Sequence, residues 1–255
     1  MSGVEISAVI PARNEAENLA ELIAEIHAAL KGRDYEIIVV DDGSTDDTPK
    51  ILAELSRSDA RLVHTRHPSS LGRSAAVYTA TRQARGSRIV TLDGDGQNDP
   101  VYIPILADRL DDPDVGLVAG QRLGRKDTGA KRAASKIANA VRRRLLGDGT
   151  RDTACGLKAF RPGAYLDLPY FETMHRFLPA LFLADGWKVD LVDVVDRPRR
   201  HGVSKYGNLD RLLVGIPDLF GVAWLTRRRR KNPIALARKG REGAPHSDKP
   251  GEIAR

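Results

Sequence analysis

Short apolar runs alternate with helical patterns through the first hundred residues of the chain. Four runs predict buried strands, namely Ile6–Ile10, Tyr35–Val40, Arg61–His64 and Ser87–Leu92. The segments between them predict helices, namely Glu17–Leu30, a helix that starts with Thr48 as N-cap and Pro49 at its first position, and Leu71–Ala84. Strands that alternate with helices predict an α/β fold with a mostly parallel sheet flanked by helices.

The pattern is less regular beyond residue 100. Further strands are predicted at Val115–Ala119 and within Asp152–Pro162 and Val189–Gly207, and a strongly basic helix is predicted at Ala130–Leu146. The apolar segment Leu209–Leu225 is interrupted by Pro217 and Asp218, and the polar residues after it have a composition typical of disorder. We therefore expect a globular domain over 1–207, an apolar helix with a basic end over 208–230, and a disordered tail over 231–255.

Composition sets limits on the class of protein. The 255-residue chain carries a formal net charge of +7, with 41% hydrophobic and 29% charged residues. The basic excess favours anionic partners such as nucleic acid, phosphorylated ligands or an acidic membrane surface. Cys155 is the single cysteine, which excludes an intramolecular disulfide and favours a reducing cytoplasm. No signal peptide is expected, and no apolar run reaches the length of a membrane-spanning helix.

The segment LDGDGQNDP, which follows the fourth predicted strand, concentrates carboxylates. If the backbone stays extended there, Asp93, Asp95 and Gln97 point to the same side and offer hard oxygen ligands suited to Mg²⁺ or Mn²⁺. The intervening glycines allow close approach of a ligand. A solvated turn is the alternative interpretation, and Asp99, which precedes Pro100, is expected to cap the next helix.

Two further polar segments follow predicted strands. In VVDDGSTDDT, Asp41 and Asp42 come directly after an apolar run, where a carboxylate can accept a hydrogen bond from a base or a ribose hydroxyl. In PARNEAEN, Arg13 and Glu15 lie at the tip of the first strand and are candidates to clamp a nucleotide, although an ordinary charged loop explains them equally well. Neither a dinucleotide-binding nor a P-loop glycine motif occurs, which disfavours both of those sites.

Basic residues form three groups. The first spans residues 120–147 and the third is Arg227–Lys231. Runs of charge are usually solvated faces, and Arg142–Arg144 is interpreted in that way. The second group differs, because glycines and an aromatic residue interleave with Arg199 and Lys205 in RRHGVSKYG, a composition that suits a loop folding over a phosphate. Candidates for contacting an acceptor phosphate in the first group are Lys131, Arg132 and Lys136.

Six motifs follow one another along the chain: VIPARNEAENL, VVDDGSTDDT, LDGDGQNDP, DTACGLKAFR, MHRFLP and RRHGVSKYG. In this order they resemble the motifs of family-2 inverting glycosyltransferases, above all those of dolichol-phosphate mannosyltransferases and bacterial polyprenyl-phosphate glycosyltransferases. The resemblance runs from about Ile6 to Gly207 and implies the GT-A type (nucleotide-diphospho-sugar transferase) fold. Arg13 departs from the family, whose members often carry an aromatic residue at that position.

The resemblance also implies roles for single residues. It implies a nucleotide-sugar site formed by Pro11, Arg13, Glu15, Val40, Asp42, Asp93 and Gly94. It implies a metal site formed by Asp93, Asp95 and Gln97. Catalytic roles at the diphosphate and at the donor or acceptor phosphates are implied for Asp95, Arg122, Arg199 and Lys205.

The implied reaction moves a sugar, with mannose as the first expectation, from GDP-mannose or a UDP-sugar to a polyprenyl or dolichyl phosphate. Mg²⁺ or Mn²⁺ and basic side chains would offset the charge of the leaving nucleoside diphosphate, and the lipid phosphate is already an anionic nucleophile, so no strong base is needed. We expect a cytoplasmic protein that lies peripherally on the cytoplasmic face of an anionic membrane. Residues 212–225, followed by arginines, suit an interfacial helix, with a helix packed on the core as an equal alternative.

Functions of other classes explain part of the same pattern. A family-2 transferase acting on a polysaccharide or another glycolipid is the nearest alternative. A nucleotidyltransferase would share the α/β frame and the aspartates, but it would release pyrophosphate. A basic nucleic-acid-binding protein explains the net charge but not the acidic clusters at strand ends, so no nucleic acid is expected as a partner.

Overall fold

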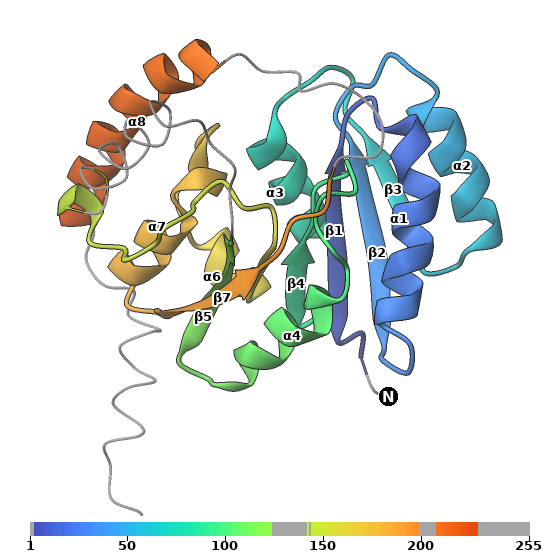
Figure 1. Ribbon diagram of the computed structural model, residues 1–255, viewed down its shortest axis with the longest axis horizontal. Coiled ribbons are helices and arrows are strands. Elements are labelled where there is room, and N and C mark those ends of the chain that lie inside the picture. The colour runs from blue at the N-terminus through green and yellow to red at the C-terminus, as the bar shows by residue number, and fades with distance from the viewer. Residues whose placement is uncertain (1–2, 124–141, 143, 199–207, 229–255) are drawn as a thin grey trace, which may run out of the picture.

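The computed structural model describes residues 3–123, 142, 144–198 and 208–228, with the backbone alone for 208–215. Seven strands within this described part form one sheet in the order β3-β2-β1-β4-β6-β5-β7 (Figure 1). In chain order they are β1 (Ile6–Ala12), β2 (Tyr35–Asp41), β3 (Leu62–Arg66), β4 (Arg88–Thr91), β5 (Val115–Arg122), β6 (Lys158–Phe160) and β7 (Lys188–Val194). Strand β6 runs antiparallel to β4 and β5, and the other pairings are parallel. The predicted α/β fold with a mostly parallel sheet is confirmed.

Helices cover both faces of this sheet. They are α1 (Ala16–Ala29), α2 (Thr48–Ser58), α3 (Arg73–Gln83), α4 (Tyr102–Asp108), α6 (Pro162–Leu166), α7 (Leu178–Ala184) and α8 (Asn208–Arg228), with short 3₁₀ turns η1 (Arg109–Asp111) and η2 (Met174–Arg176). Helices α1, α2 and α4 pack in one hydrophobic cluster, and α3, α6, α7 and α8 pack in a second. The sheet therefore lies between two helical layers (Figure 1).

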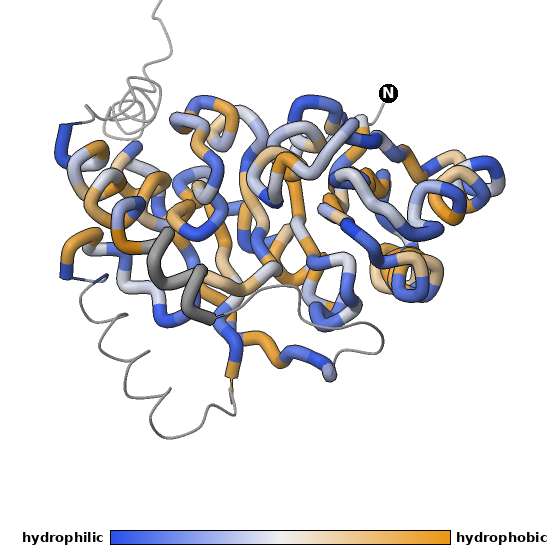
Figure 2. The backbone as a smooth tube through the Cα atoms, turned by 90° about the horizontal axis from the view of Figure 1, so that it is seen from above, coloured by the Kyte–Doolittle hydropathy of each residue, from blue (hydrophilic) through white to orange (hydrophobic). Residues whose placement is uncertain are grey.

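Side chains of successive strand residues enter opposite layers. In β1, Ile6 and Ile10 belong to the cluster with α1, whereas Val9 belongs to the cluster with α3. Strand β2 repeats this division with Ile37 and Ile38. Because both faces are covered, these strands are apolar at most positions, which is why they are visible as apolar runs. Ser7 and Glu36 are buried exceptions, and the Ser7 hydroxyl donates to the Glu36 carboxylate at 2.7 Å. In the helices, hydrophobic and hydrophilic residues alternate along the turns, as the orange and blue stretches show (Figure 2).

One predicted helix start needs correction. Helix α2 begins at Thr48, but its N-cap residue is Asp47, and Pro49 is the second helical residue. The Thr48 hydroxyl serves a different contact, because it accepts a hydrogen bond from the Glu15 backbone N–H at 2.9 Å. Asp46 supplies part of the missing cap by accepting from the Thr48 N–H at 3.0 Å.

A second correction concerns Arg142 in the basic run at 142–144, of which Arg144 is exposed, as expected. Positions 142 and 144–146 are helical, and the rest of the predicted basic helix lies outside the described residues. Arg142 was expected on a solvated face, yet it is buried and donates to the Asp148 carboxylate and to the Thr150 carbonyl. Asp148 and Thr150, in the loop that follows the helix, contact Arg142, and an ion pair between residues six positions apart is not visible as a periodic pattern.

The apolar segment near the C-terminus forms one continuous helix, α8, with Pro217 inside it. Val222 on this helix is buried and packs in the second hydrophobic cluster. None of the helices in the described part of the chain is long and apolar enough to cross a membrane. The predicted tail over 231–255 lies outside the described residues.

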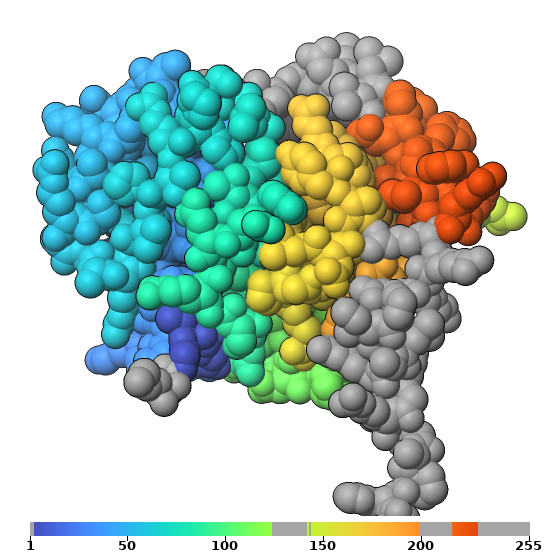
Figure 3. All heavy atoms as spheres, turned by 180° about the vertical axis from the view of Figure 1, so that it is seen from behind, coloured from blue at the N-terminus to red at the C-terminus, as the bar shows by residue number. Residues whose placement is uncertain are grey.

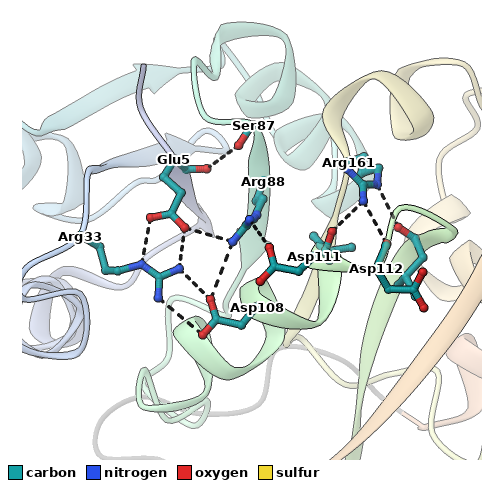
Figure 4. A network of polar contacts seen from close by, with 10 residues as sticks. Glu5, Arg33, Ser87, Arg88, Asp108, Asp111, Asp112 and Arg161 are labelled. Carbon is teal, nitrogen blue, oxygen red and sulfur yellow. Dashed lines mark hydrogen bonds and ion pairs between the residues drawn. The ribbon is translucent and has the colours of Figure 1, made fainter. Parts of the chain in front are cut away.

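An ion network joins the strands at the edge of the sheet where β1 and β4 begin (Figure 4). Arg33 pairs with Glu5 at 2.6 Å and with Asp108 at 2.7 Å, and Arg88 pairs with Glu5 at 3.0 Å and with Asp111. These contacts link β1, β4 and α4 far from the polar loops described below. We assign this network to stability.

Candidate functional site

The loops after β1 and β2 are joined by backbone-to-side-chain hydrogen bonds at the carboxyl ends of these strands. The Asn14 N–H donates to Ser44 Oγ at 2.8 Å, and the Thr45 N–H donates to Asn14 Oδ1 at 2.8 Å. Asn14 has a φ of 52°, in the left-handed region that Asn tolerates better than most residues. The two loops therefore form one rigid rim at the end of the sheet, where ligands gather in α/β folds.

Several residues predicted to bind the nucleotide come together at this rim. Pro11 on β1 is paired in register with Val40 on β2. Gly94 lies over the end of β1, and a Cβ atom placed on it would be 3.4 Å from the Pro11 carbonyl oxygen and 3.4 Å from Glu15 Cγ. Arg13 is exposed at the tip of the loop. The structure therefore brings Pro11, Glu15, Val40 and Gly94 together at this end of the sheet, and their role in binding a nucleotide stays a prediction.

Asp42 is engaged within the protein. Its Oδ1 accepts from the Leu71 N–H and lies 2.8 Å from His67 Nδ1, and its Oδ2 accepts from the Ser70 hydroxyl and the Gly72 N–H, all within 2.9 Å. Burial raises the pKa of this carboxyl, but the four hydrogen bonds outweigh it and leave the pKa below its ordinary value. Asp42 thus anchors the loop before α3, and its predicted contact with a nucleotide would require exchange of one of these bonds.

The aspartate segment has a different backbone from the one expected. Strand β4 ends at Thr91, the chain turns at Gly94 and Asp95, and Gly96 has a φ of 72°. The expectation of an extended segment is wrong, because the glycines permit a tight turn in which the Gln97 N–H donates to Asp95 Oδ1 at 3.1 Å. The predicted metal set of Asp93, Asp95 and Gln97 stays a prediction.

Three residues that sequence reasoning missed surround Asp93. Arg73, the first residue of α3, forms an ion pair with the Asp93 carboxylate. Asn98 Oδ1 accepts from the Asp93 N–H at 2.9 Å. Gly156 lies so close that a Cβ atom on it would overlap both the Asp93 carboxylate and Asn98. Gly156 belongs to the motif DTACGLKAFR, so the motif carried a signal, but its partner could not be read from the sequence.

Arg122, predicted at a phosphate, is held by two carboxylates. Its Nε and one terminal nitrogen contact the two Asp152 oxygens at 2.5 and 3.0 Å, and the other terminal nitrogen lies 3.3 Å from Asp196. Asp196 in turn accepts from Asn98 Nδ2 at 3.2 Å. Burial raises the pKa of Asp196 more than the nearby Arg122 guanidinium lowers it. Asp196 therefore connects the arginine to the aspartate segment.

Two basic side chains, the buried Lys158 and the half-buried His175, lie near Arg73. Lys158 donates from Nζ to the Thr153 carbonyl at 3.3 Å and to the Cys155 carbonyl, and burial together with Arg73 lowers its pKa to about 8. His175 Nδ1 lies 2.8 Å from the Ser74 hydroxyl, and burial lowers the pKa of His175. The contact with His175 holds Ser74, the residue after Arg73, whereas Lys158 holds the loop that contains Cys155.

Other predicted residues fall outside this cluster or outside the described chain. Asp41 serves the turn after β2, since its Oδ1 accepts from the Ser44 N–H at 2.8 Å and its Oδ2 lies 3.4 Å from Arg66. Asp99 Oδ1 accepts from the Val101 N–H at 3.0 Å in the turn before α4. The N-cap residue of α4 is Val101, without a side-chain cap, so the expectation that Asp99 caps this helix is wrong because the turn at Pro100 and Val101 separates it from the helix start. The predicted phosphate contacts that lie outside the described residues are Lys131, Arg132, Lys136, Arg199 and Lys205.

Comparison with solved structures identifies the fold. Glucosyl-3-phosphoglycerate synthase from Mycobacterium tuberculosis, crystallised with Mn²⁺, uridine-diphosphate-glucose and phosphoglyceric acid, superposes with a TM-score of 0.62 at 23% identity, over 87% of this chain and 79% of that one. Mannosyl-3-phosphoglycerate synthase from Rubrobacter xylanophilus gives a TM-score of 0.60 at 20% identity, over 98% and 78%. The expected GT-A fold is confirmed.

Sequence comparison gives the family. The profile of Glycosyl transferase family 2 matches residues 7–168. A dodecaprenyl-phosphate galacturonate synthase from Rhizobium johnstonii is 33% identical over 233 residues, which cover 89% of this chain and 69% of the relative. An undecaprenyl-phosphate 4-deoxy-4-formamido-L-arabinose transferase from Edwardsiella ictaluri is 33% identical over 205 residues, covering 79% of this chain and 63% of that one. The chain thus spans about two thirds of the length of these relatives, and it belongs to glycosyl transferase family 2.

Proposed function

We propose that this protein transfers a sugar from a nucleotide diphosphate sugar to a polyprenyl phosphate at a membrane surface. The observation that carries the proposal is the connection between the Asp93–Asp95 turn and Arg122 through Asn98 and Asp196. An acidic group suited to a cation and a fixed guanidinium suited to a phosphate lie in one hydrogen-bonded unit. The names of the two relatives support a lipid phosphate as the acceptor.

The residues at the turn fit a divalent cation. Asp93, Asp95 and Gln97 supply carboxylate and amide oxygens, the ligand type of Mg²⁺ and Mn²⁺, and a diphosphate would complete the coordination. Within the described residues, no group of three or more His, Cys, Asp or Glu side chains is arranged to hold a metal ion. When bound, the cation would stabilise the negative charge of the leaving nucleoside diphosphate.

The protein's own side chains would orient and balance the two phosphate groups. Arg73 is positioned to exchange its ion pair with Asp93 for a donor phosphate oxygen, because its guanidinium already lies at the aspartate turn. Arg122 is locked in one orientation by the bidentate contact with Asp152 and so offers a preorganised positive charge. A phosphate monoester acceptor is anionic near pH 7, so its oxygen attacks the sugar without removal of a proton by the protein.

The identity of the sugar is the finer part of the proposal. Mannose from GDP-mannose is the expectation that the motifs support, whereas the names of the two relatives add galacturonate and 4-deoxy-4-formamido-L-arabinose. A UDP-sugar donor is compatible with the uridine-diphosphate-glucose complex of the structural relative. A donor panel that contains both nucleotides therefore tests the proposal better than a single compound.

A transfer assay tests the function directly. The protein would be incubated with Mn²⁺ or Mg²⁺, undecaprenyl phosphate in detergent and GDP-mannose, UDP-glucose or UDP-galacturonate, and the glycolipid identified by mass spectrometry. We expect one donor to react, chelation of the metal to stop transfer, and Asp95→Asn to lower kcat/KM roughly 100-fold.

Asp34→Asn is the matched control, because Asp34 is an exposed carboxylate outside the site. Its kcat/KM is expected to equal that of the unaltered protein. Transfer to a soluble polysaccharide but not to the lipid would replace the proposed acceptor. Release of pyrophosphate in place of a nucleoside diphosphate would replace the reaction class.

A further inference from the structure

Helix α8 carries apolar side chains on two opposite faces. On the inner face, Val222 is 3% exposed and packs, with the partly buried Leu219 and Leu225, in the cluster formed with α3, α6 and α7. On the outer face, Ile216, Phe220 and Trp224 are 48%, 61% and 60% exposed. A helix at the surface of a globular domain ordinarily presents polar residues to water. The outer face of α8 therefore calls for a partner.

The inner face fixes α8 to the domain. Asp218, the acidic residue that interrupts the apolar segment, accepts from the Thr173 hydroxyl at 2.6 Å. Thr173 lies two residues before His175, which contacts the start of α3. Figure 3 shows α8 (orange to red) on the outside of the molecule beside the yellow segment that precedes it in the chain. The helix is thus an outer wall of the domain, oriented by Asp218.

The outer residues form a continuous stripe with a basic end. Ile216, Phe220 and Trp224 are spaced by four residues, so they follow one another along one side of the helix. Arg228 continues this spacing, and its guanidinium carbon lies 5.6 Å from the centre of the Trp224 ring. Arg227 is exposed beside it. The stripe thus passes from large apolar side chains to positive charge within three turns.

We propose that this stripe docks the whole domain on an anionic lipid bilayer, with Ile216, Phe220 and Trp224 entering the interface and Arg227 and Arg228 facing lipid phosphates. Charge complementarity favours lipid over a second copy of the chain, because the sequence continues with Arg229, Arg230 and Lys231 and a second copy would bring the same charge. Since the inner face is packed, docking would orient the domain and not merely tether it.

This inference deepens the proposed function, because a polyprenyl phosphate acceptor is reached at a bilayer surface, but docking itself requires neither donor nor metal. Vesicles that contain no polyprenyl phosphate therefore test docking alone. The transfer assay in detergent tests the reaction alone, so failure of one does not imply failure of the other.

Tryptophan fluorescence offers a direct readout. The chain has two tryptophans, and Trp187 is only 7% exposed, so a change on lipid addition reports mainly on Trp224. The protein would be titrated with vesicles of phosphatidylcholine and with vesicles that also contain phosphatidylglycerol, without metal. With anionic vesicles we expect a blue shift and protection from acrylamide quenching, and with neutral vesicles and at high salt a weaker effect.

Serine substitutions of exposed apolar residues distinguish binding through the stripe from nonspecific hydrophobic binding of vesicles. The double variant Ile216→Ser/Phe220→Ser retains Trp224 as a probe, and we expect its vesicle partition coefficient to fall at least about tenfold. The matched control is Val101→Ser/Ile105→Ser, at the start of and within α4, where the two side chains are 53% and 43% exposed. This control should bind vesicles like the unaltered protein, and circular dichroism would verify that both variants fold.

Three results would overturn the proposal. One is the absence of any spectral change with anionic vesicles. Another is equal binding of the stripe variant and the unaltered protein, which would mean that basic residues act without the apolar stripe. The third is a dimer in sedimentation experiments that the stripe variant abolishes, which would assign the face to a second copy of the chain.

Discussion

Asp42 illustrates how a carboxylate in a candidate nucleotide site can serve the fold. Four donors converge on its two oxygens, and they come from His67 and from the loop Ser70–Gly72. An ionised carboxylate accepts all of these bonds, whereas an amide group would place an N–H against the donors on one side. The loop that Asp42 anchors leads directly into Arg73, so the position of Arg73 beside Asp93 depends on it.

Asp42→Asn therefore should lower stability. We expect a loss of about 1–3 kcal/mol in the free energy of unfolding near pH 7, because at least one buried donor loses its acceptor. The pKa of Asp42 is below its ordinary value, so its stabilising contribution is present above the unfolded pKa of about 4 and is lost as the pH falls through the folded value. Urea denaturation between pH 7 and 3 measures this.

The difference in the free energy of unfolding between Asp42→Asn and the unaltered protein should shrink as the pH falls from 5 to 3. Asp34→Asn, at an exposed position, should track the unaltered protein throughout. A difference that stays constant with pH would show that the Asp42 carboxylate gives no net stabilisation in its charged form.

Gly156 tests a contact between two motifs that are distant in sequence. A methyl group at this position would overlap the Asp93 carboxylate and Asn98, and Asp93 is paired with Arg73 on the other side and cannot simply move away. We expect Gly156→Ala to weaken binding of a nucleoside diphosphate with Mn²⁺ at least about tenfold in calorimetry, since site geometry is sensitive to displacements below 1 Å.

Gly163→Ala is the control for that substitution, because a Cβ at Gly163 meets no atom within 4 Å. Equal affinities of both variants would show that the aspartate turn adjusts to the added methyl group. A large fall in stability of Gly156→Ala without a change in affinity would assign the glycine to packing alone.

At the scale of elements, the features that depend on the local pattern of apolar and polar residues could be predicted from the sequence. The parallel strands, the first three helices and the placement of the polar loops at strand ends follow from periodicity and turn residues, and the structure confirms them. The antiparallel direction of β6 was not predictable, since a run as short as Lys158–Phe160 carries no signal for direction. The contacts of Arg73 and Asp196 with the aspartate turn were missed for a similar reason, because they depend on how distant segments pack.

Helix α8 also shows a feature that the sequence alone could not determine. Its apolar composition permits either an interfacial helix or one packed on the core, and composition alone cannot distinguish them. The structure shows packing on one face and exposure on the other, with Asp218 as the residue that fixes the orientation. The Asp218 carboxylate looked like an interruption of the pattern, and its partner Thr173 lies 45 residues away in sequence.

At the scale of the whole molecule, charged residues gather at the two ends of the strands, the carboxyl ends and the amino ends. The carboxyl ends of the strands carry the candidate site, where Arg122 and Arg73 are held near acidic groups that a substrate would rearrange. The amino ends carry the network around Arg33, in which every charge is already balanced by a neighbour (Figure 4). Stability and ligand binding should therefore respond to different substitutions.

Arg33→Met separates these two roles. Removing the guanidinium leaves Glu5 and Asp108 near each other without their shared cation, and we expect a loss of about 1 kcal/mol in the free energy of unfolding, given that all three side chains are partly exposed. The Arg33 hydrogen bond lowers the pKa of Glu5, so this contribution is present above the unfolded pKa and lost as the pH falls below it. Added salt should reduce the effect of the substitution. Lys31→Met, an exposed position two residues away, should leave stability unchanged.

The affinity for a nucleoside diphosphate with Mn²⁺ should be the same in both variants and the unaltered protein. A fall in affinity for Arg33→Met would show that the two ends of the strands are coupled.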